Sequence, residues 1–164
     1  GFGNGAHLPY LFAKAPYLHY TGIERSEAMI AEATALNTAL VEQGKAVFLH
    51  APTEGLPPLP YECFEVCFTV NTYYFITDLR AYFAQVYSLL RQGGSFVLGA
   101  IGKEFGERMP FTKEVFIFYT SDQLRELLLS VGFTTFDLQT FTEEISTKRG
   151  TTIERPFEVI TVRK

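Results

Sequence analysis

Apolar segments of two kinds alternate along this 164-residue chain. Short apolar runs predict strands, and the longer runs between them, in which apolar residues recur at helical spacing, predict helices. Alternation of this kind is typical of a parallel sheet, because parallel strands need a crossover connection, usually a helix. We therefore expect an α/β fold.

The expected elements follow one another without an internal repeat or a linker, so we expect residues 1–164 to form a single domain. Ser26 and Ser121 are the expected N-caps of two helices, and Gly44 is expected to end the first of them. No helix separates the last two strands, which should pair as an antiparallel hairpin at one edge of the sheet. The expected strands are 17–24, 46–50, 64–70, 95–101, 133–141 and 157–162, and the expected helices are 6–15, 27–43, 78–91 and 121–131.

Charge and cysteine content exclude several classes of function. The 14 Lys and Arg against 18 Asp and Glu give a net charge of −4, which argues against a nucleic-acid partner because such proteins carry a basic face. No apolar run approaches the ~18 residues of a membrane span. Cys63 and Cys67 lack a second ligand pair, so we expect no metal site. Free thiols in an apolar run predict a cytoplasmic location.

Glycines dominate the first five residues, Gly1-Phe2-Gly3-Asn4-Gly5, directly before the first expected helix. Glycine permits a tight turn that brings backbone N–H groups against a ligand at a helix N-terminus. Glu24 ends the next expected strand, 19 residues after Gly5, where an acid can accept hydrogen bonds from ribose hydroxyls. The loop and the acid together predict a site for a nucleoside-containing cofactor. The run Gly1 to Ala6 also fits the dinucleotide pattern, so these residues leave the choice of cofactor open.

Three further motifs follow the glycine loop in a fixed order. They are Thr21-Gly22-Ile23-Glu24-Arg25-Ser26-Glu27-Ala28-Met29, Thr53-Glu54-Gly55-Leu56-Pro57 and Leu89-Leu90-Arg91-Gln92-Gly93-Gly94-Ser95. Over nearly its whole length, the chain with these motifs resembles the class I S-adenosylmethionine-dependent methyltransferases. The resemblance implies a doubly wound, mostly parallel, Rossmann-like sheet with a C-terminal antiparallel hairpin.

The resemblance also implies where the cofactor S-adenosyl-L-methionine binds. Glu24 would hold both ribose hydroxyls, Arg25 and Met29 would flank the adenine, and Asn71 would lie near the methionine ammonium. The full implied set is Gly1, Phe2, Gly3, Asn4, Glu24, Arg25, Met29, Thr53, Glu54 and Asn71. The family often has an Asp in the adenine loop where this chain has Pro52, so adenine recognition is expected to come from backbone groups.

Two other departures from the family pattern affect what the resemblance implies. Asn71-Thr72-Tyr73-Tyr74 lacks both prolines of the Asn-Pro-Pro-Tyr signature of amino methyltransferases, so this motif does not lead us to infer methylation of nucleic acids or protein amides. The family places an acid two residues before its first glycine, at the end of its first strand, and this sequence begins after that point. We therefore expect an N-terminally truncated domain without that strand; a rearranged sheet is the alternative.

Aromatic residues point to the methyl acceptor. The chain holds 16 Phe and 9 Tyr but no Trp. Tyr73 and Tyr74 are candidate catalytic residues because they follow a strand, and Tyr74, Phe105, Phe111 and Phe116 are candidate substrate-binding residues. Gly102 and Gly106 bracket the start of an aromatic segment that we interpret as a lid over the acceptor.

The sequence therefore predicts methyl transfer from S-adenosyl-L-methionine to a small, partly apolar or aromatic molecule by in-line displacement. Two alternatives are a non-catalytic nucleoside-binding or scaffold domain of the same fold, and a nicotinamide-dependent oxidoreductase. The terminal hairpin and the lack of a Tyr-x-x-x-Lys pair count against the oxidoreductase. The oligomeric state cannot be predicted from the sequence.

Overall fold

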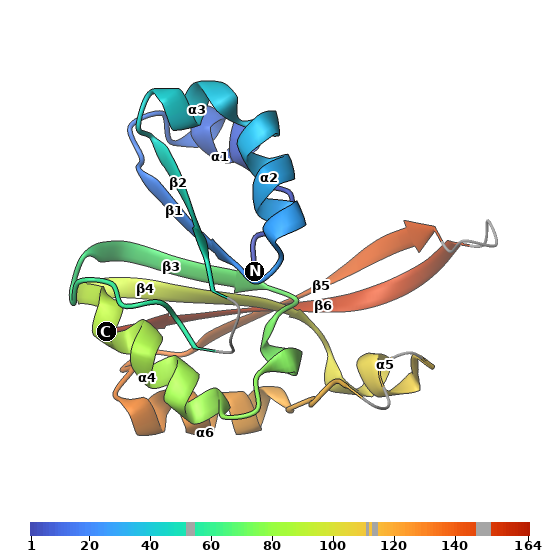
Figure 1. Ribbon diagram of the computed structural model, residues 1–164. Coiled ribbons are helices and arrows are strands. Elements are labelled where there is room, and N and C mark those ends of the chain that lie inside the picture. Colours follow the sequence, from blue (N-terminus) through green and yellow to red (C-terminus); the bar gives the residue numbers. More distant parts are fainter. Residues whose placement is uncertain (52–54, 111, 113–114, 147–151) are drawn as a thin grey trace. The chain divides into compact units, whose positions relative to one another are not determined.

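The computed structural model describes residues 1–51, 55–110, 112, 115–146 and 152–164. It divides the chain into two compact units, Gly1–Pro58 and Leu59–Lys164. Each unit has its own sheet and its own helices (Figure 1).

The first unit contains a two-stranded parallel sheet and three helices. Tyr20 lies opposite Ala46 and Glu24 lies opposite His50, so both strands end at the same edge. A small apolar core of Leu8, Phe12, Tyr20 and Ala46 joins the strands to the first helix. The elements are α1 (Leu8–Lys14), β1 (Tyr20–Glu24), α2 (Glu27–Leu36), α3 (Thr38–Glu42) and β2 (Ala46–His50).

The helix expected between Ser26 and Gly44 begins as predicted but is interrupted. The Ser26 side chain accepts a hydrogen bond from the Met29 backbone N–H at 3.4 Å, which confirms the N-cap. The interruption falls at Asn37, whose side-chain amide donates to the Ala33 carbonyl at 2.9 Å. Asn side chains compete in this way with the helical backbone pattern. Leu36, the last residue before the interruption, is 55% exposed.

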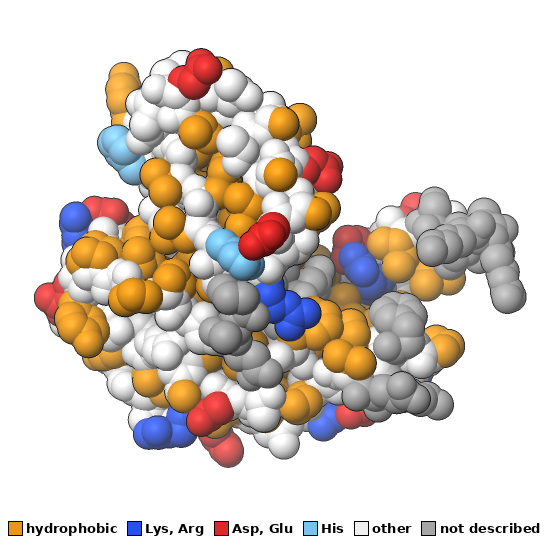
Figure 2. Space-filling model, viewed as in Figure 1, with side chains coloured by type: hydrophobic (Ala, Val, Ile, Leu, Met, Phe, Trp, Pro, Cys, Tyr) orange, Lys and Arg blue, Asp and Glu red, His pale blue; other side chains and the backbone are white. Residues whose placement is uncertain are grey.

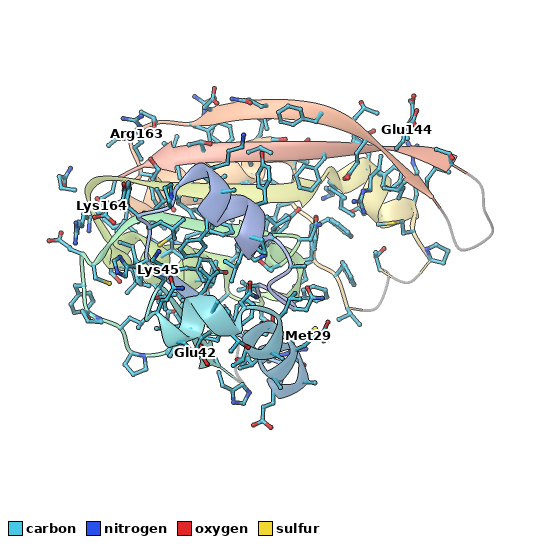
Figure 3. All side chains as sticks on the ribbon, turned by 90° about the horizontal axis from the view of Figure 1, so that it is seen from above. Met29, Glu42, Lys45, Glu144, Arg163 and Lys164 are labelled. Atoms are coloured by element: carbon cyan, nitrogen blue, oxygen red, sulfur yellow. The ribbon has the colours of Figure 1, made fainter. Side chains whose placement is uncertain are left out.

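The second unit contains a four-stranded mixed sheet in the order β3-β4-β6-β5. The pair β3 and β4 is parallel, whereas β6 runs antiparallel to both β4 and β5. The expected terminal hairpin is therefore confirmed. Its second strand is longer than predicted, and its first strand begins at Asp137 instead of Phe133 and runs on to Ser146. Figure 3 labels Glu144 near one end of the hairpin and Arg163 and Lys164 at the other. The elements are β3 (Phe64–Val70), η1 (Tyr73–Phe75), α4 (Leu79–Leu89), β4 (Leu90–Ile101), α5 (Lys103–Arg108), α6 (Ser121–Val131), β5 (Asp137–Ser146) and β6 (Thr152–Arg163).

Helices α4 and α6 lie along one face of this sheet (Figure 1). The ring of Phe83 on α4 packs on Phe96 of β4 with centroids 5.8 Å apart. The N-cap of α6 is Thr120, one residue before the expected Ser121. Thr120 and Gln123 form a capping box in which each side chain bonds the other's backbone N–H, an arrangement that pairs two otherwise unsatisfied donors.

Hydrophobic side chains also reach the surface of both units (Figure 2). On β3, the alternate residues Val66, Phe68 and Val70 are all more than 40% exposed. Within the described part of the chain, no helix is long and apolar enough to cross a membrane.

Candidate cofactor-binding site

The glycine loop turns tightly at two positions of the first unit. Gly3 has φ +61° and Gly5 has φ +68°, a left-handed conformation that glycine adopts without steric cost. A Cβ on Gly5 would come within 2.9 Å of Asn37 Nδ2 and 3.1 Å of Ala33 Cβ, so the loop packs closely against α2. Apart from Gly3 and its two chain neighbours, no atom of the described residues lies within 4 Å of the position a Cβ would take on Gly3, which leaves this part of the loop accessible to a ligand.

Glu24 lies at the end of β1 and joins the strand to the glycine loop. Its Oε2 accepts a hydrogen bond from the Gly3 N–H at 2.9 Å. Its Oε1 accepts from the N–H groups of Arg25 at 2.8 Å and Ser26 at 3.1 Å. Partial burial disfavours the charged carboxylate, but the three backbone donors and the charge of the N-terminal ammonium together outweigh burial and place the pKa of Glu24 below its ordinary value. Glu24 is therefore ionised at neutral pH, and its hydrogen bond to Gly3 holds its carboxylate beside the glycine loop. A nucleoside site of the expected kind needs an ionised acid next to such a loop.

Other predicted cofactor residues of this unit have contacts within the protein. The Phe2 ring packs on Phe48 with centroids 4.8 Å apart, so its side chain belongs to the packing of the unit. Asn4 Oδ1 accepts from the Ala6 N–H at 3.2 Å, which stabilises the loop turn. Its Nδ2 donates to Glu32 Oε1 at 2.9 Å.

Arg25 and Met29 lie just beyond Glu24. Arg25 is exposed, and its carbonyl oxygen is 3.0 Å from His50 Nε2. Met29 is half-buried in the first turn of α2, where Figure 3 labels it. Thr53 and Glu54, expected near the adenine amine, lie outside the described residues, as does Pro52.

Asn37 is a supporting residue of the loop that sequence reasoning missed. It is 4% exposed, and its Nδ2 donates to the Gly5 carbonyl at 3.2 Å as well as to Ala33. Buried polar side chains normally have such partners. The available signal was a lone Asn within an apolar helical pattern, but its partner 32 residues away could not be read from that pattern.

Asn71, Tyr73 and Tyr74 gather at the end of β3 in the second unit. Asn71 has φ +55°, and both tyrosines are only 1% exposed. Burial raises the pKa of Tyr73 to about 12 and also raises the pKa of Tyr74. Both phenols are therefore neutral at pH 7, so neither is a ready proton acceptor there.

The aromatic residues predicted to bind the substrate differ in how deeply they are buried. Phe116 stacks on Tyr74 with centroids 5.6 Å apart, and Phe105 is half-buried on α5. Phe111 lies outside the described residues. Sequence reasoning missed Phe75, which is 41% exposed and meets Phe116 edge-on with centroids 4.5 Å apart.

Comparison with known proteins identifies the family of this chain. The family model described as "Methyltransferase domain" matches residues 1–98, more than half of the chain. No curated protein matches the chain.

Solved structures share the fold at low sequence identity. An S-adenosylmethionine-dependent methyltransferase from Mesorhizobium loti is 16% identical with a TM-score of 0.75, over 100% of this chain and 88% of that one. The YcgJ protein from Bacillus subtilis is 15% identical with a TM-score of 0.77, over 100% and 89%. A chain from the complex of the Haloferax volcanii Trm112 methyltransferase activator is 14% identical with a TM-score of 0.82, over 99% and 78%. Because the family model matches more than half of the chain, the chain belongs to the class I S-adenosylmethionine-dependent methyltransferases, enzymes whose cofactor is S-adenosyl-L-methionine.

Proposed function

We propose that this methyltransferase transfers a methyl group to a small, partly apolar or aromatic acceptor by in-line displacement. The observation that carries the proposal is the aromatic cluster that Phe116 forms with η1, the turn that follows β3. Ligands of open α/β sheets bind outside the carboxyl ends of the strands, and aromatic rings offer such ligands a large apolar surface. We assign Phe105 and Phe116 to the acceptor site and add Phe75, whose exposed ring meets Phe116. Tyr74, predicted to bind the substrate, is only 1% exposed, and we propose that it supports the Phe116 ring that stacks on it.

When bound, S-adenosylmethionine supplies a methyl group that its positively charged sulfur has already activated. The residues of the chain therefore have to bind the two reactants, align them and exclude water. In our proposal, Glu24 binds the ribose hydroxyls and the loop Gly1 to Asn4 binds the methionine part. Arg25 and Met29 flank the adenine, and Asn71 receives the methionine ammonium.

The bonds already made by Glu24 support its proposed role and add a condition. A carboxylate offers about four acceptor positions, and the N–H groups of Gly3, Arg25 and Ser26 take three of them. Holding two ribose hydroxyls therefore requires that one backbone N–H group be exchanged for a hydroxyl. The loop N–H of Gly3 is the donor whose movement disturbs the strand least, because Arg25 and Ser26 directly follow β1.

We also propose that both units form one methyltransferase domain, because the family match spans residues 1–98 and so includes parts of each.

Cys63 and Cys67 are free thiols. Their state supports a reducing compartment such as the cytoplasm.

The test of the cofactor site is calorimetric titration of the wild-type chain and Glu24→Ala with S-adenosylhomocysteine. Loss of hydrogen bonds to a charged group should weaken binding by ~1.5–3 kcal/mol, which is about a tenfold to hundredfold rise in Kd. Glu42→Ala is the matched control, because Glu42 is an exposed carboxylate at the end of α3 in the same unit (Figure 3). Equal affinities of Glu24→Ala and wild type would remove Glu24 from the site.

The acceptor is to be sought with mass spectrometry after incubation of the enzyme and S-adenosylmethionine with a metabolite extract. We expect a methylated small molecule that forms with the wild type and at a much lower rate with Glu24→Ala. Tight cofactor binding without any methylated product would favour the scaffold alternative, and binding of NAD instead would favour the oxidoreductase.

A further inference from the structure

The hydroxyl group of Tyr74 connects the ends of two neighbouring strands. Tyr74 lies in η1, just after β3, and its oxygen accepts a hydrogen bond from the backbone N–H of Ile101 at 2.6 Å. Ile101 is the last residue of β4. The same hydroxyl donates its proton to Asn71 Oδ1 at 3.1 Å. A phenol has one proton to donate, so the direction of this series of hydrogen bonds is fixed: Ile101 donates to Tyr74, and Tyr74 donates to Asn71.

Asn71, which accepts the last of these hydrogen bonds, has an unusual backbone conformation. Its φ of +55° is uncommon for a residue other than glycine, although Asn tolerates it better than most. Its N–H still donates to the Gly99 carbonyl at 2.9 Å, which anchors the residue to β4. Among the backbone hydrogen bonds of the turns and loops that the structure describes, none is accepted by the Asn71 carbonyl oxygen. Asn71 is thus held at its backbone N–H and at its side chain, and its carbonyl oxygen remains as a hydrogen-bond acceptor at the end of β3.

Packing alone does not account for the hydroxyl of Tyr74. Its ring is 1% exposed and contacts Tyr73 and Phe118 at centroid distances of 4.3 and 4.8 Å. A phenylalanine would fill the same volume without placing a polar atom in the interior, where an unpaired polar group is costly. The hydroxyl therefore has the specific effect of holding Asn71 against the end of β4.

We propose that Tyr74 is a positioning residue, which holds Asn71 so that its carbonyl oxygen can accept a hydrogen bond from the ammonium group of the cofactor's methionine part. The inference rests on the proposed function, in which Asn71 lies at that end of the cofactor. It replaces the expectation that Tyr74 acts as a catalytic group, because its one proton is donated to Asn71 and its oxygen already accepts from Ile101.

The test compares two probes that differ at the end that Asn71 would bind. S-Adenosylhomocysteine carries the amino-acid ammonium, whereas 5′-methylthioadenosine lacks the whole amino-acid part. Tyr74→Phe should raise the Kd of the first about tenfold, which corresponds to ~1.4 kcal/mol, and leave the Kd of the second unchanged. In an Asn71→Gly background, which keeps the backbone carbonyl and the left-handed φ but removes the side-chain anchor, Tyr74→Phe should cause no further loss.

Tyr82→Phe is the matched control for the loss of a buried phenol hydroxyl. Tyr82 lies on α4 of the same unit and hydrogen-bonds Thr69, so this variant should lose stability in a thermal melt yet keep the ratio of the two affinities.

Three outcomes would overturn the inference while the proposed function stood: an unchanged affinity of Tyr74→Phe for S-adenosylhomocysteine, an equal loss for both probes, or additive losses in the double variant. If the wild-type chain bound neither probe, the proposed function would fail and the inference with it. Circular dichroism of each variant shows that the comparison is made on folded protein.

Discussion

At the scale of single residues, Glu24 has a structural role in addition to the proposed ligand role. Its carboxylate holds the N–H groups of Gly3, Arg25 and Ser26, so it ties the glycine loop to the end of β1. The position of an acid after the strand could be predicted from the sequence. The three donors could not, because they depend on how the loop returns to the strand.

The pH dependence of stability follows from this arrangement. The pKa of Glu24 is lower in the folded chain than its ordinary value of 4.5, so the unfolded chain binds the proton more readily. Glu24 therefore contributes stability above about pH 4.5, and this contribution is lost as the pH falls through the folded pKa. Glu24→Gln should show a shallower decline of the unfolding free energy below that pH than the wild type. Urea unfolding at a series of pH values measures this, and parallel curves for the two proteins would contradict it.

At the scale of elements, residues 115–119 are joined to η1 by a backbone hydrogen bond. The Ile117 N–H donates to the Tyr74 carbonyl at 2.9 Å, and Phe118 is buried against Gly106 of α5. Gly106, interpreted from the sequence as a hinge of a lid, has a packing reason to be glycine, since a Cβ there would overlap the Phe118 ring. Phe116, on the same stretch of chain, is only half-buried.

This contrast predicts different effects for two neighbouring substitutions. Phe118→Ala removes a buried ring and should lower the unfolding free energy by ~3–5 kcal/mol. Phe116→Ala should cost less stability and leave the affinity for S-adenosylhomocysteine nearly unchanged, but it should reduce turnover of the acceptor. Thermal melts beside activity assays make the comparison. Normal specific activity in the folded fraction of Phe116→Ala would remove this ring from the acceptor site.

At the scale of the whole molecule, charge bears on the class of acceptor. The chain carries a net charge of −4, and the aromatic residues assigned to the acceptor site provide apolar surface without cations for phosphate contacts. The substrate proposal therefore excludes polynucleotides.

Fluorescence anisotropy with labelled DNA and RNA tests this exclusion at two salt concentrations, about 50 mM and 200 mM, between which a protein with several phosphate contacts loses affinity steeply. We expect weak binding or none at both concentrations. Tight binding that falls steeply between them would show a nucleic-acid surface and contradict the proposed acceptor.

Local patterns determined much of the architecture. Alternating apolar segments predicted β1, β2, β3 and β4 and the helices between them, and the missing helix near the end predicted the hairpin of β5 and β6. Helical periodicity and the Ser26 cap depend on residues within a few positions of one another, so they can be read from the sequence. The order of the glycine loop and Glu24 likewise predicted a site for a nucleoside-containing cofactor.

Tertiary structure alone decided the contacts around the predicted site residues. Asn37 interrupts its helix and binds Gly5, Glu24 binds Gly3, and Tyr74 joins Asn71 to Ile101. The Asn37, Glu24 and Ile101 bonds link positions between 21 and 32 residues apart, and local propensity carries no information about such pairs. Whether a hydroxyl or an amide finds a partner at that separation depends on how the elements pack, because packing places the donor and the acceptor within hydrogen-bond distance and shields both from water.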